Sequence, residues 1–251
     1  MDASAVSRQT LPSDDGLVEF IDLGALSYTR AYEIQRDTHA RVVAARPPLD
    51  APFSAAARGG VAYFLTHQPA VVTVSRRVGA ASNVLKSKAQ LEVLGVECVE
   101  TDRGGDVTWH GPGQIVVYLI LDLNRLGLRV GGYLRMLEGA VIEALADFGI
   151  RGERDPTATG VWVEGRKICA MGVRLSRWVS MHGIALNVNP DLAQFDLIVP
   201  CGLVGRQVTS VAKELGSGAP EFARVKQVLA FRLNQAIRRA ATAAEAQHAT
   251  R

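Results

Sequence analysis

Two residues of this chain could carry out covalent chemistry together. Lys167 follows Glu164-Gly165-Arg166, and Cys201 lies in Val199-Pro200-Cys201-Gly202. A thiol is a strong nucleophile only as the thiolate, and a neighbouring ammonium favours that state and can exchange protons with it. The pair therefore suggests covalent acyl chemistry. Each residue also has a plainer explanation, because most intracellular cysteines are inert and buried, and a lysine beside Glu-Gly can simply solvate a hairpin turn.

The surroundings of both residues favour a chemical role. Lysine is rare here, with five lysines among 28 basic residues, so the chain uses at position 167 the cation whose proton can leave when it is desolvated. Cys201 follows an apolar run and sits between proline and glycine, which suggests exposure at the end of an element. Cys98 and Cys169 lie in apolar alternation and are expected in the core. Three unpaired cysteines argue against a disulfide framework and against a zinc ribbon.

A glycine-rich stretch, Arg103–Gln114, precedes a long apolar run and is a second candidate for function. Its four glycines permit tight turns and close approach to a ligand, with backbone amides available for a carbonyl or an anion. The alternative is a glycine-rich turn that enters a strand. The spacing is not that of a dinucleotide fingerprint. His110 and His182 could serve as substrate support or as hydrogen-bonded structure, whereas His39 and His67 look peripheral.

Hydrophobic periodicity predicts an α+β fold, with strands flanked by segregated helices. Ser27 can cap a helix that runs towards Ala45, and a second helix is expected over 134–145, with Gly149 as its stop. A last helix begins near Pro220. Strands are expected at 62–65 and 70–74, at 114–123 in the centre of the sheet, and in a meander over 160–163, 166–174 and 178–189.

Length and composition fit one domain with a substantial core: the chain has 251 residues, 48% of them hydrophobic, and a net charge of +3. We expect disordered tails at 1–16 and 241–251 around a single catalytic domain at 17–240. The sequence lacks a signal peptide and a run long enough to span a membrane, which predicts a cytoplasmic protein. No pattern indicates a metal site, a phosphate loop or nucleic-acid binding.

Several blocks of the sequence, taken in order, resemble the lipoyl(octanoyl) transferase family. The match runs from about Leu23 to Phe231. The blocks are Arg103-Gly104-Gly105 through Thr108–Gln114, Arg166-Lys167-Ile168, His182-Gly183 with Ala185-Leu186-Asn187, Pro200-Cys201-Gly202 and Thr209-Ser210.

The resemblance implies a fold shared with lipoate-protein and biotin-protein ligases, which has a mixed or antiparallel β-sheet core with helices against it. It also implies a reaction that needs no cofactor, in which octanoyl moves from octanoyl-acyl carrier protein to a lysine of a lipoyl domain. The acceptors would be the lipoyl domains of 2-oxoacid dehydrogenase complexes and the glycine cleavage H protein. By the same resemblance, Cys201 would form an octanoyl thioester, and Lys167 would lower the pKa of the thiol and shuttle protons. The residues implied to line the acyl pocket are Arg103, Gly104, Gly105, Asp106, Val107, Thr108, Trp109, His110, Ala170, Met171, Gly172, His182, Gly183 and Ile184.

The segment His67–Arg76 departs from the family pattern, because Ser75 replaces a glycine and an acidic residue is absent. This leaves the geometry of the local loop open. Two other functions are also open. An ATP-dependent lipoate or biotin ligase on the same fold would need an adenylate-binding lysine and would not need Cys201. A non-catalytic acyl-binding or regulatory protein would keep the pocket but form no covalent intermediate.

Overall fold

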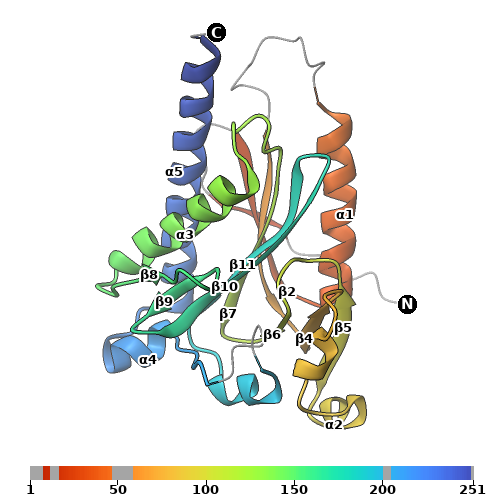
Figure 1. The fold of residues 1–251 in the computed structure, drawn as a ribbon. Coiled ribbons are helices and arrows are strands. Elements are labelled where there is room, and N and C mark those ends of the chain that lie inside the picture. Colours follow the sequence, from red (N-terminus) through yellow and green to blue (C-terminus); the bar gives the residue numbers. More distant parts are fainter. Residues whose placement is uncertain (1–7, 12–16, 47–58, 200–204, 250–251) are drawn as a thin grey trace.

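The fold is a large mixed sheet with helices on both faces and a smaller sheet at one end (Figure 1). The computed structural model describes residues 8–11, 17–46, 59–199 and 205–249. The helices are α1 (Tyr28–Ala44), α2 (Lys88–Val93), α3 (Val130–Ala146), α4 (Val211–Leu215) and α5 (Phe222–Ala249), with 3-10 turns η1 (Ala80–Asn83), η2 (Leu192–Leu197) and η4 (Gly216–Gly218). The strands are β1 (Gln9–Thr10), β2 (Val18–Leu26), β3 (Gly60–His67), β4 (Ala70–Ser75), β5 (Val96–Thr101), β6 (Val107–His110), β7 (Gln114–Leu121), β8 (Glu153–Arg154), β9 (Val161–Val163), β10 (Arg166–Ser176) and β11 (Val179–Asn187).

The large sheet has the order β1-β2-β3-β7-β11-β10-β9-β8, and the small sheet has the order β5-β4-β6. The pairs β2–β3 and β4–β5 are parallel and the others are antiparallel, so the prediction of a mixed sheet is confirmed. The expected meander is also present as β9, β10 and β11. Its first turn places Glu164 and Gly165 at positive φ, as a two-residue hairpin turn requires.

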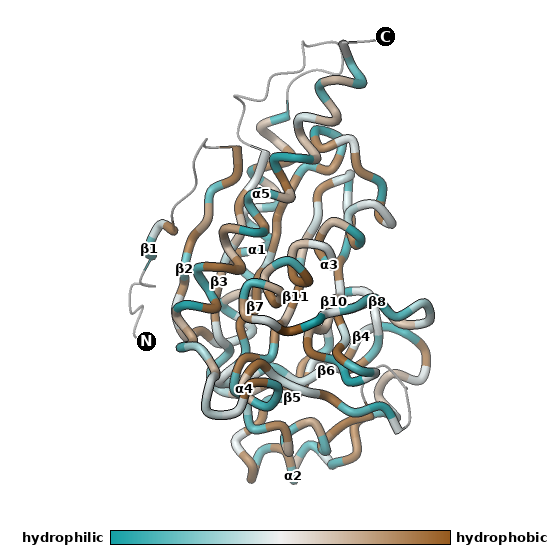
Figure 2. The backbone as a smooth tube through the Cα atoms, turned by 90° about the vertical axis from the view of Figure 1, so that its left-hand side faces the viewer, coloured by the Kyte–Doolittle hydropathy of each residue, from teal (hydrophilic) through white to brown (hydrophobic). Residues whose placement is uncertain are grey.

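Strand β7 lies inside the sheet and is buried along its whole length, as its continuous apolar run predicts. Its side chains alternate between two cores. Val117 and Leu119 pack with α3 and α5, whereas Val116 and Ile120 pack with α1. Both views show the helices on opposite faces of the sheet (Figures 1 and 2). No helix among the described residues is long and apolar enough to cross a membrane.

The small sheet has a core of its own, in which Val72, Leu91 and Trp109 pack with Phe195 of η2. The stretch between β4 and β5 contains η1 and α2. In both views α2 lies at the end of the molecule opposite to the C-terminal end of α5 (Figures 1 and 2). The small sheet therefore packs around its own hydrophobic core, apart from the two cores of the large sheet.

The ends of the chain correct two expectations. Residues 241–249 continue α5, and Ala241 and Ala244 are buried, so the predicted C-terminal tail is wrong for this part. Alanine has the highest helix propensity, and its small side chain packs where little space is left; Ala244 lies close to Gly127. At the other end, Gln9 and Thr10 pair with β2, so these two residues are ordered.

The two described cysteines differ in exposure. Cys169 is buried, as expected, and burial raises the pKa of its thiol to about 12. Cys98 is exposed, so its placement in the core was wrong. It lies on β5, an edge strand of the small sheet, where one face meets solvent and alternation therefore does not imply burial on both faces.

Candidate active site

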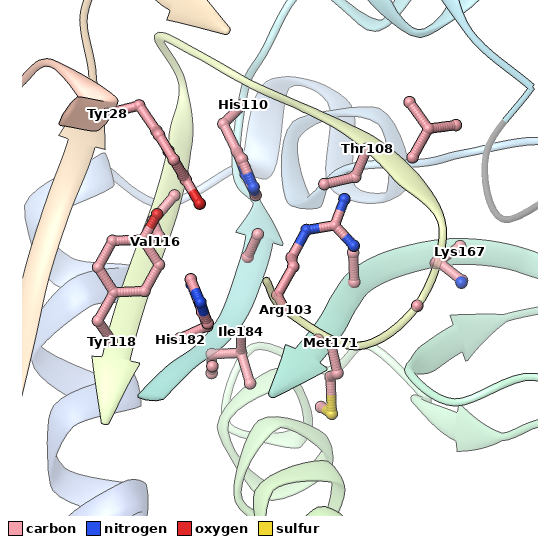
Figure 3. Close-up of a pocket in the computed structure, with 16 residues that line it drawn as sticks. Tyr28, Arg103, Thr108, His110, Val116, Tyr118, Lys167, Met171, His182 and Ile184 are labelled. Carbon is pink, nitrogen blue, oxygen red and sulfur yellow. The ribbon is translucent and has the colours of Figure 1, made fainter. Parts of the chain in front are cut away.

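A pocket lies where the glycine-rich stretch and β6 meet the ends of β7, β10 and β11 (Figure 3). Tyr28 and Tyr118 lie at one end of its lining and Lys167 lies at the other. The structure brings together twelve of the residues predicted for the site: Arg103, Gly105, Val107, Thr108, His110, Lys167, Ala170, Met171, Gly172, His182, Gly183 and Ile184.

Three residues predicted for the acyl pocket do not line it. Gly104 donates its amide to Val173 O at 3.0 Å, and a Cβ there would come within 2.9 Å of that oxygen, so this glycine holds the loop against β10. Asp106 accepts a hydrogen bond from Asn83 at 2.9 Å, away from the pocket. Trp109 packs on Phe195 with ring centroids 5.3 Å apart, because it points to the opposite face of β6 from its neighbours.

Four further residues line the pocket that sequence reasoning missed: Tyr28, Val116, Tyr118 and Ala185. Val116 and Tyr118 are two positions apart on β7 and so share a face. The alternation of side chains along a strand predicts that these two residues lie on the same face. Because every residue of this run is apolar or buried, the sequence does not show which of the two faces meets a ligand. With Met171 and Ile184, these residues make one wall of the pocket apolar.

Lys167 is buried to all but 7% and is fixed through both its backbone and its side chain. Its amide donates to Gln207 O, and its carbonyl accepts from the Thr209 amide, each at 2.9 Å. Its ammonium nitrogen lies 4.7 Å from the centre of the Trp162 ring, a cation–π distance. The guanidinium carbon of Arg206 lies 4.8 Å from the same ring centre. Lys167 is therefore a buried residue that lines the pocket and is not a solvated turn residue.

Cys201 lies outside the described residues, together with Pro200 and Gly202. The chain on both sides of it is attached to the site. Before it, Val199 donates its amide to Asn83 O at 2.8 Å. After it, Gln207 accepts from Lys167, and Arg206 forms an ion pair with Asp155 at 2.6 Å.

His182 lines the pocket with a constrained backbone and a fixed ring. Its φ is +60°, a conformation that costs energy for any residue except glycine, and its amide donates to the buried Gln35 side chain at 2.7 Å. Its Nε2 lies 2.9 Å from the Asp102 carboxylate, which also accepts from Tyr32 and from Arg174. Because a carboxylate only accepts, Nε2 carries the proton. The bond from His182 lowers the pKa of Asp102, whereas burial lowers the pKa of His182.

His67 lies behind the pocket and is completely buried, so the expectation that it is peripheral was wrong. Its Nδ1 lies 3.0 Å from Leu26 O, which can only accept, so Nδ1 carries a proton. Burial lowers the pKa of His67 to about 4, and the ring is therefore neutral near pH 7. Its Nε2 must then accept from the Tyr118 hydroxyl at 2.7 Å. The sequence shows a histidine beside a turn but not the tyrosine 51 residues later that binds it.

A chain of side-chain hydrogen bonds connects the glycine-rich stretch to the backbone beside Lys167. It runs from His110 Nδ1 to Gln114 Oε1 at 2.7 Å, from Gln114 Nε2 to Asn187 Oδ1 at 2.9 Å, and from Asn187 Nδ2 to Thr209 O at 3.0 Å. Every side chain in it is buried, and buried polar groups are costly unless they are paired. These hydrogen bonds therefore hold the small sheet, β7, β11 and the segment at Thr209, which pairs with Lys167, in fixed positions relative to one another.

The segment that departs from the family pattern has a defined role in the structure. The Ser75 hydroxyl donates to Gly105 O at 2.9 Å and accepts from the Arg77 amide at 3.2 Å. Nearby, the Arg103 guanidinium donates to the Thr73 carbonyl and hydroxyl, both at 2.9 Å. The serine thus fastens the glycine-rich loop to β4, a contact that a glycine could not make. Among the described residues, no group of three or more His, Cys, Asp or Glu side chains could hold a metal ion.

The fold is that of lipoate-protein ligases. Lipoate-protein ligase A bound with ATP superposes with a TM-score of 0.64 at 13% identity, covering 90% of this chain and 86% of that one. The bipartite lipoate protein ligase of Thermoplasma acidophilum superposes with a TM-score of 0.65 at 15% identity, covering 89% and 84%. Residues 52–234 match the family of the lipoyl protein ligase A/B catalytic domain. The fold and the pocket thus define a catalytic domain of this class.

Sequence relatives narrow the class further. An octanoyltransferase of Chloroflexus aurantiacus is 44% identical over 216 residues, covering 85% of this chain and 91% of its own. An octanoyltransferase of Christiangramia forsetii is 49% identical over 173 residues, covering 66% of this chain and 74% of its own. This chain belongs to the octanoyltransferase family and is an acyltransferase.

Proposed function

We propose that this enzyme transfers an octanoyl group from octanoyl-acyl carrier protein to a lysine of a lipoyl domain, through a thioester on Cys201. The acceptors are the lipoyl domains of 2-oxoacid dehydrogenase complexes and the glycine cleavage H protein. The observation that carries the proposal is that Lys167 lies at one end of an apolar pocket and is hydrogen-bonded to the chain that follows Cys201. The relatives named octanoyltransferase support the acyl group.

The pocket suits an alkyl chain. The aliphatic residues and the methionine that line it are Val107, Val116, Ala170, Met171, Ile184 and Ala185. Each methylene that such side chains bury contributes roughly 0.8 kcal/mol to binding, so an octanoyl chain can anchor its donor. Gly172 allows the glycine-rich stretch to pack against β10 at this point, because a Cβ there would lie 2.7 Å from Gly104 O.

The reaction then proceeds in two balanced steps. The Cys201 thiolate attacks the thioester carbonyl of the donor, Lys167 having taken the thiol proton, and that proton passes to the departing pantetheine sulfur. The acceptor amine next attacks the Cys201 thioester, loses a proton to Lys167, and the cysteine sulfur leaves. Exchange of one thioester for another is nearly thermoneutral, so the first step needs no ATP. Backbone amides that hold each oxyanion would contribute about 3–4 kcal/mol per donor.

Intact-mass analysis tests the covalent step. After incubation with octanoyl-acyl carrier protein, the wild-type enzyme should gain one octanoyl group, and Cys201→Ser should gain none. Lys167→Arg should retain charge but lose most transfer, because arginine does not release its proton near neutral pH. An adduct-free wild type that still transfers octanoyl would exclude the thioester. Transfer that requires ATP would indicate a ligase, and tight acyl binding without transfer would indicate a binding protein.

A further inference from the structure

The stretch between β4 and β5, residues 76–94, combines exposed cations with exposed apolar side chains. Four of the seven large apolar residues that the described part of the chain exposes lie in this 76–94 segment: Val78 at 99%, Leu85 at 55%, Val93 at 88% and Leu94 at 56%. Such side chains at the surface of a soluble protein mark an interaction site when they gather in one place. The four belong to α2 and to the residues that flank η1 and α2, and α2 lies at one end of the molecule (Figure 1).

The charge of the same segment is mostly positive. It contains Arg76, Arg77, Lys86 and Lys88 and one carboxylate, Glu92. The segment therefore carries +3, which equals the net charge of the whole chain, and all the other residues together carry no net charge. Arg76 lies 3.4 Å from Glu100 in a pair that is about 70% exposed on both sides, which solvent screens. Lys86 and Lys88 are exposed and form no ion pair with any residue that the structure describes.

The middle of the 76–94 segment is hydrogen-bonded to two stretches of chain that lead to the candidate site. Asn83 donates to Asp106 of the glycine-rich stretch at 2.9 Å and accepts from the Val199 amide at 2.8 Å. Leu85 donates its amide to Leu197 O at 2.9 Å. The segment thus borders both the loop that covers the pocket and the chain that leads to Cys201. None of its own residues lines the pocket.

We propose that the 76–94 segment is the docking surface for the acyl donor, the acidic carrier protein that bears the octanoyl thioester. The inference rests on the proposed function and adds a surface to it. Four cations around apolar side chains are complementary to an acidic helical protein, and such charges speed encounter and set orientation. The position favours the donor over the acceptor. The donor's thioester is at the end of a long pantetheine arm, which can reach the pocket from a surface outside it. The acceptor's reactive lysine is short, and its protein must sit at the mouth of the pocket.

The test compares two donors with the same thioester, octanoyl-acyl carrier protein and octanoyl-pantetheine, which lacks the protein. The double variant Lys86→Glu/Lys88→Glu should raise KM for the carrier protein about tenfold and leave the kinetic constants for octanoyl-pantetheine unchanged. Val93→Ser/Leu94→Ser should raise the same KM about threefold to tenfold. The matched control is Arg151→Glu/Arg177→Glu, which makes the same change in net charge at two exposed positions elsewhere. It should leave KM for the carrier protein within about twofold of wild type at physiological salt.

Three outcomes overturn the docking surface. Equal loss with both donors would mean that the segment only supports the pocket. A raised KM for the lipoyl-domain acceptor, with the donor unaffected, would assign the surface to the acceptor. An equal rise in KM for the carrier protein in the control variant would mean that the change in net charge, and not its position, causes the effect. The proposed function fails separately, since it requires wild-type transfer from either donor. A wild type inactive with both donors would refute that function, whatever the variants do.

Discussion

Trp162 gives the sharpest test of how the site holds Lys167. The indole is 1% exposed and the lysine 7%, so their contact at 4.7 Å is desolvated. Cation–π contacts contribute about 0.5–1 kcal/mol at exposed sites and about 2 kcal/mol when desolvated. If the ring holds the ammonium where the reaction needs it, Trp162→Leu should lower kcat by up to about 30-fold, since 1.4 kcal/mol corresponds to a factor of ten. Trp162→Phe keeps a ring and should lose about threefold to fivefold.

The same substitution also leaves a cavity, so folding must be separated from positioning. Loss of a buried tryptophan costs about 3–5 kcal/mol, and the Ala158 carbonyl loses the indole N–H that donates to it. Leu137→Ala is the matched control, because Leu137 is a fully buried residue of α3 and does not line the pocket. Octanoyl transfer should be measured at a temperature where thermal denaturation shows each variant to be folded. If Trp162→Leu keeps the kcat of Leu137→Ala, while KM is also unchanged, the ring does not position Lys167.

Three other predictions follow from contacts in and around the pocket. Gly183→Ala should abolish soluble expression or lower stability by several kcal/mol, because φ is +159° and a Cβ would lie 2.2 Å from Val117 O; a stable, active variant would contradict this. His67 has a folded pKa of about 4 against an ordinary value of 6.5, so the unfolded state binds the proton first as the pH falls. Its stability contribution is complete above pH 6.5 and is lost between pH 6.5 and 4, about 3 kcal/mol in all. Urea unfolding of His67→Gln should therefore show a weaker loss between pH 7.5 and pH 5 than wild type, and an identical loss would refute the assignment. Asp102→Asn should lower kcat by about tenfold at a temperature where the variant is folded, because the amide can present its NH2 group to His182, and the imidazole then loses its orientation. The variant should also be less stable at pH 7, because the interactions that lower the pKa of Asp102 stabilise its carboxylate in the folded state. Tyr32→Phe, which removes only one other bond to the same carboxylate, should have a smaller effect.

The sequence predicts the elements well where a local signal sets them. Three local signals each predict one structure: the Ser27 cap a helix start, Glu164-Gly165 a hairpin turn, and the apolar run of β7 a buried strand. All three structures are present. Burial was harder to predict. Cys98 alternates like a core residue but lies on an edge strand, and the alanines after position 240 lack bulk but pack all the same.

The site was predictable as a set of blocks but not as a geometry. The glycine-rich stretch, Lys167 and His182 do meet at one pocket. Tyr28 and Tyr118 also line it, yet nothing local distinguishes them from other buried tyrosines. The pairing of His67 with Tyr118, and of His182 with Asp102, joins residues 51 and 80 positions apart. Such contacts arise from the order of strands in the sheet, which no single stretch of sequence contains.

The buried chain of amides has a direction, and that direction fixes where one proton lies. The Thr209 carbonyl can only accept, so Asn187 must present its nitrogen to it and its oxygen to Gln114. Gln114 then donates from its nitrogen and has only an oxygen left for His110, which must donate from Nδ1. Burial keeps the pKa of His110 well below its usual range, so the ring carries that one proton and its Nε2 can only accept a hydrogen bond. A backbone carbonyl nearly a hundred residues away in sequence thus selects the tautomer of a histidine that lines the pocket, and reversing any one amide would break the whole series.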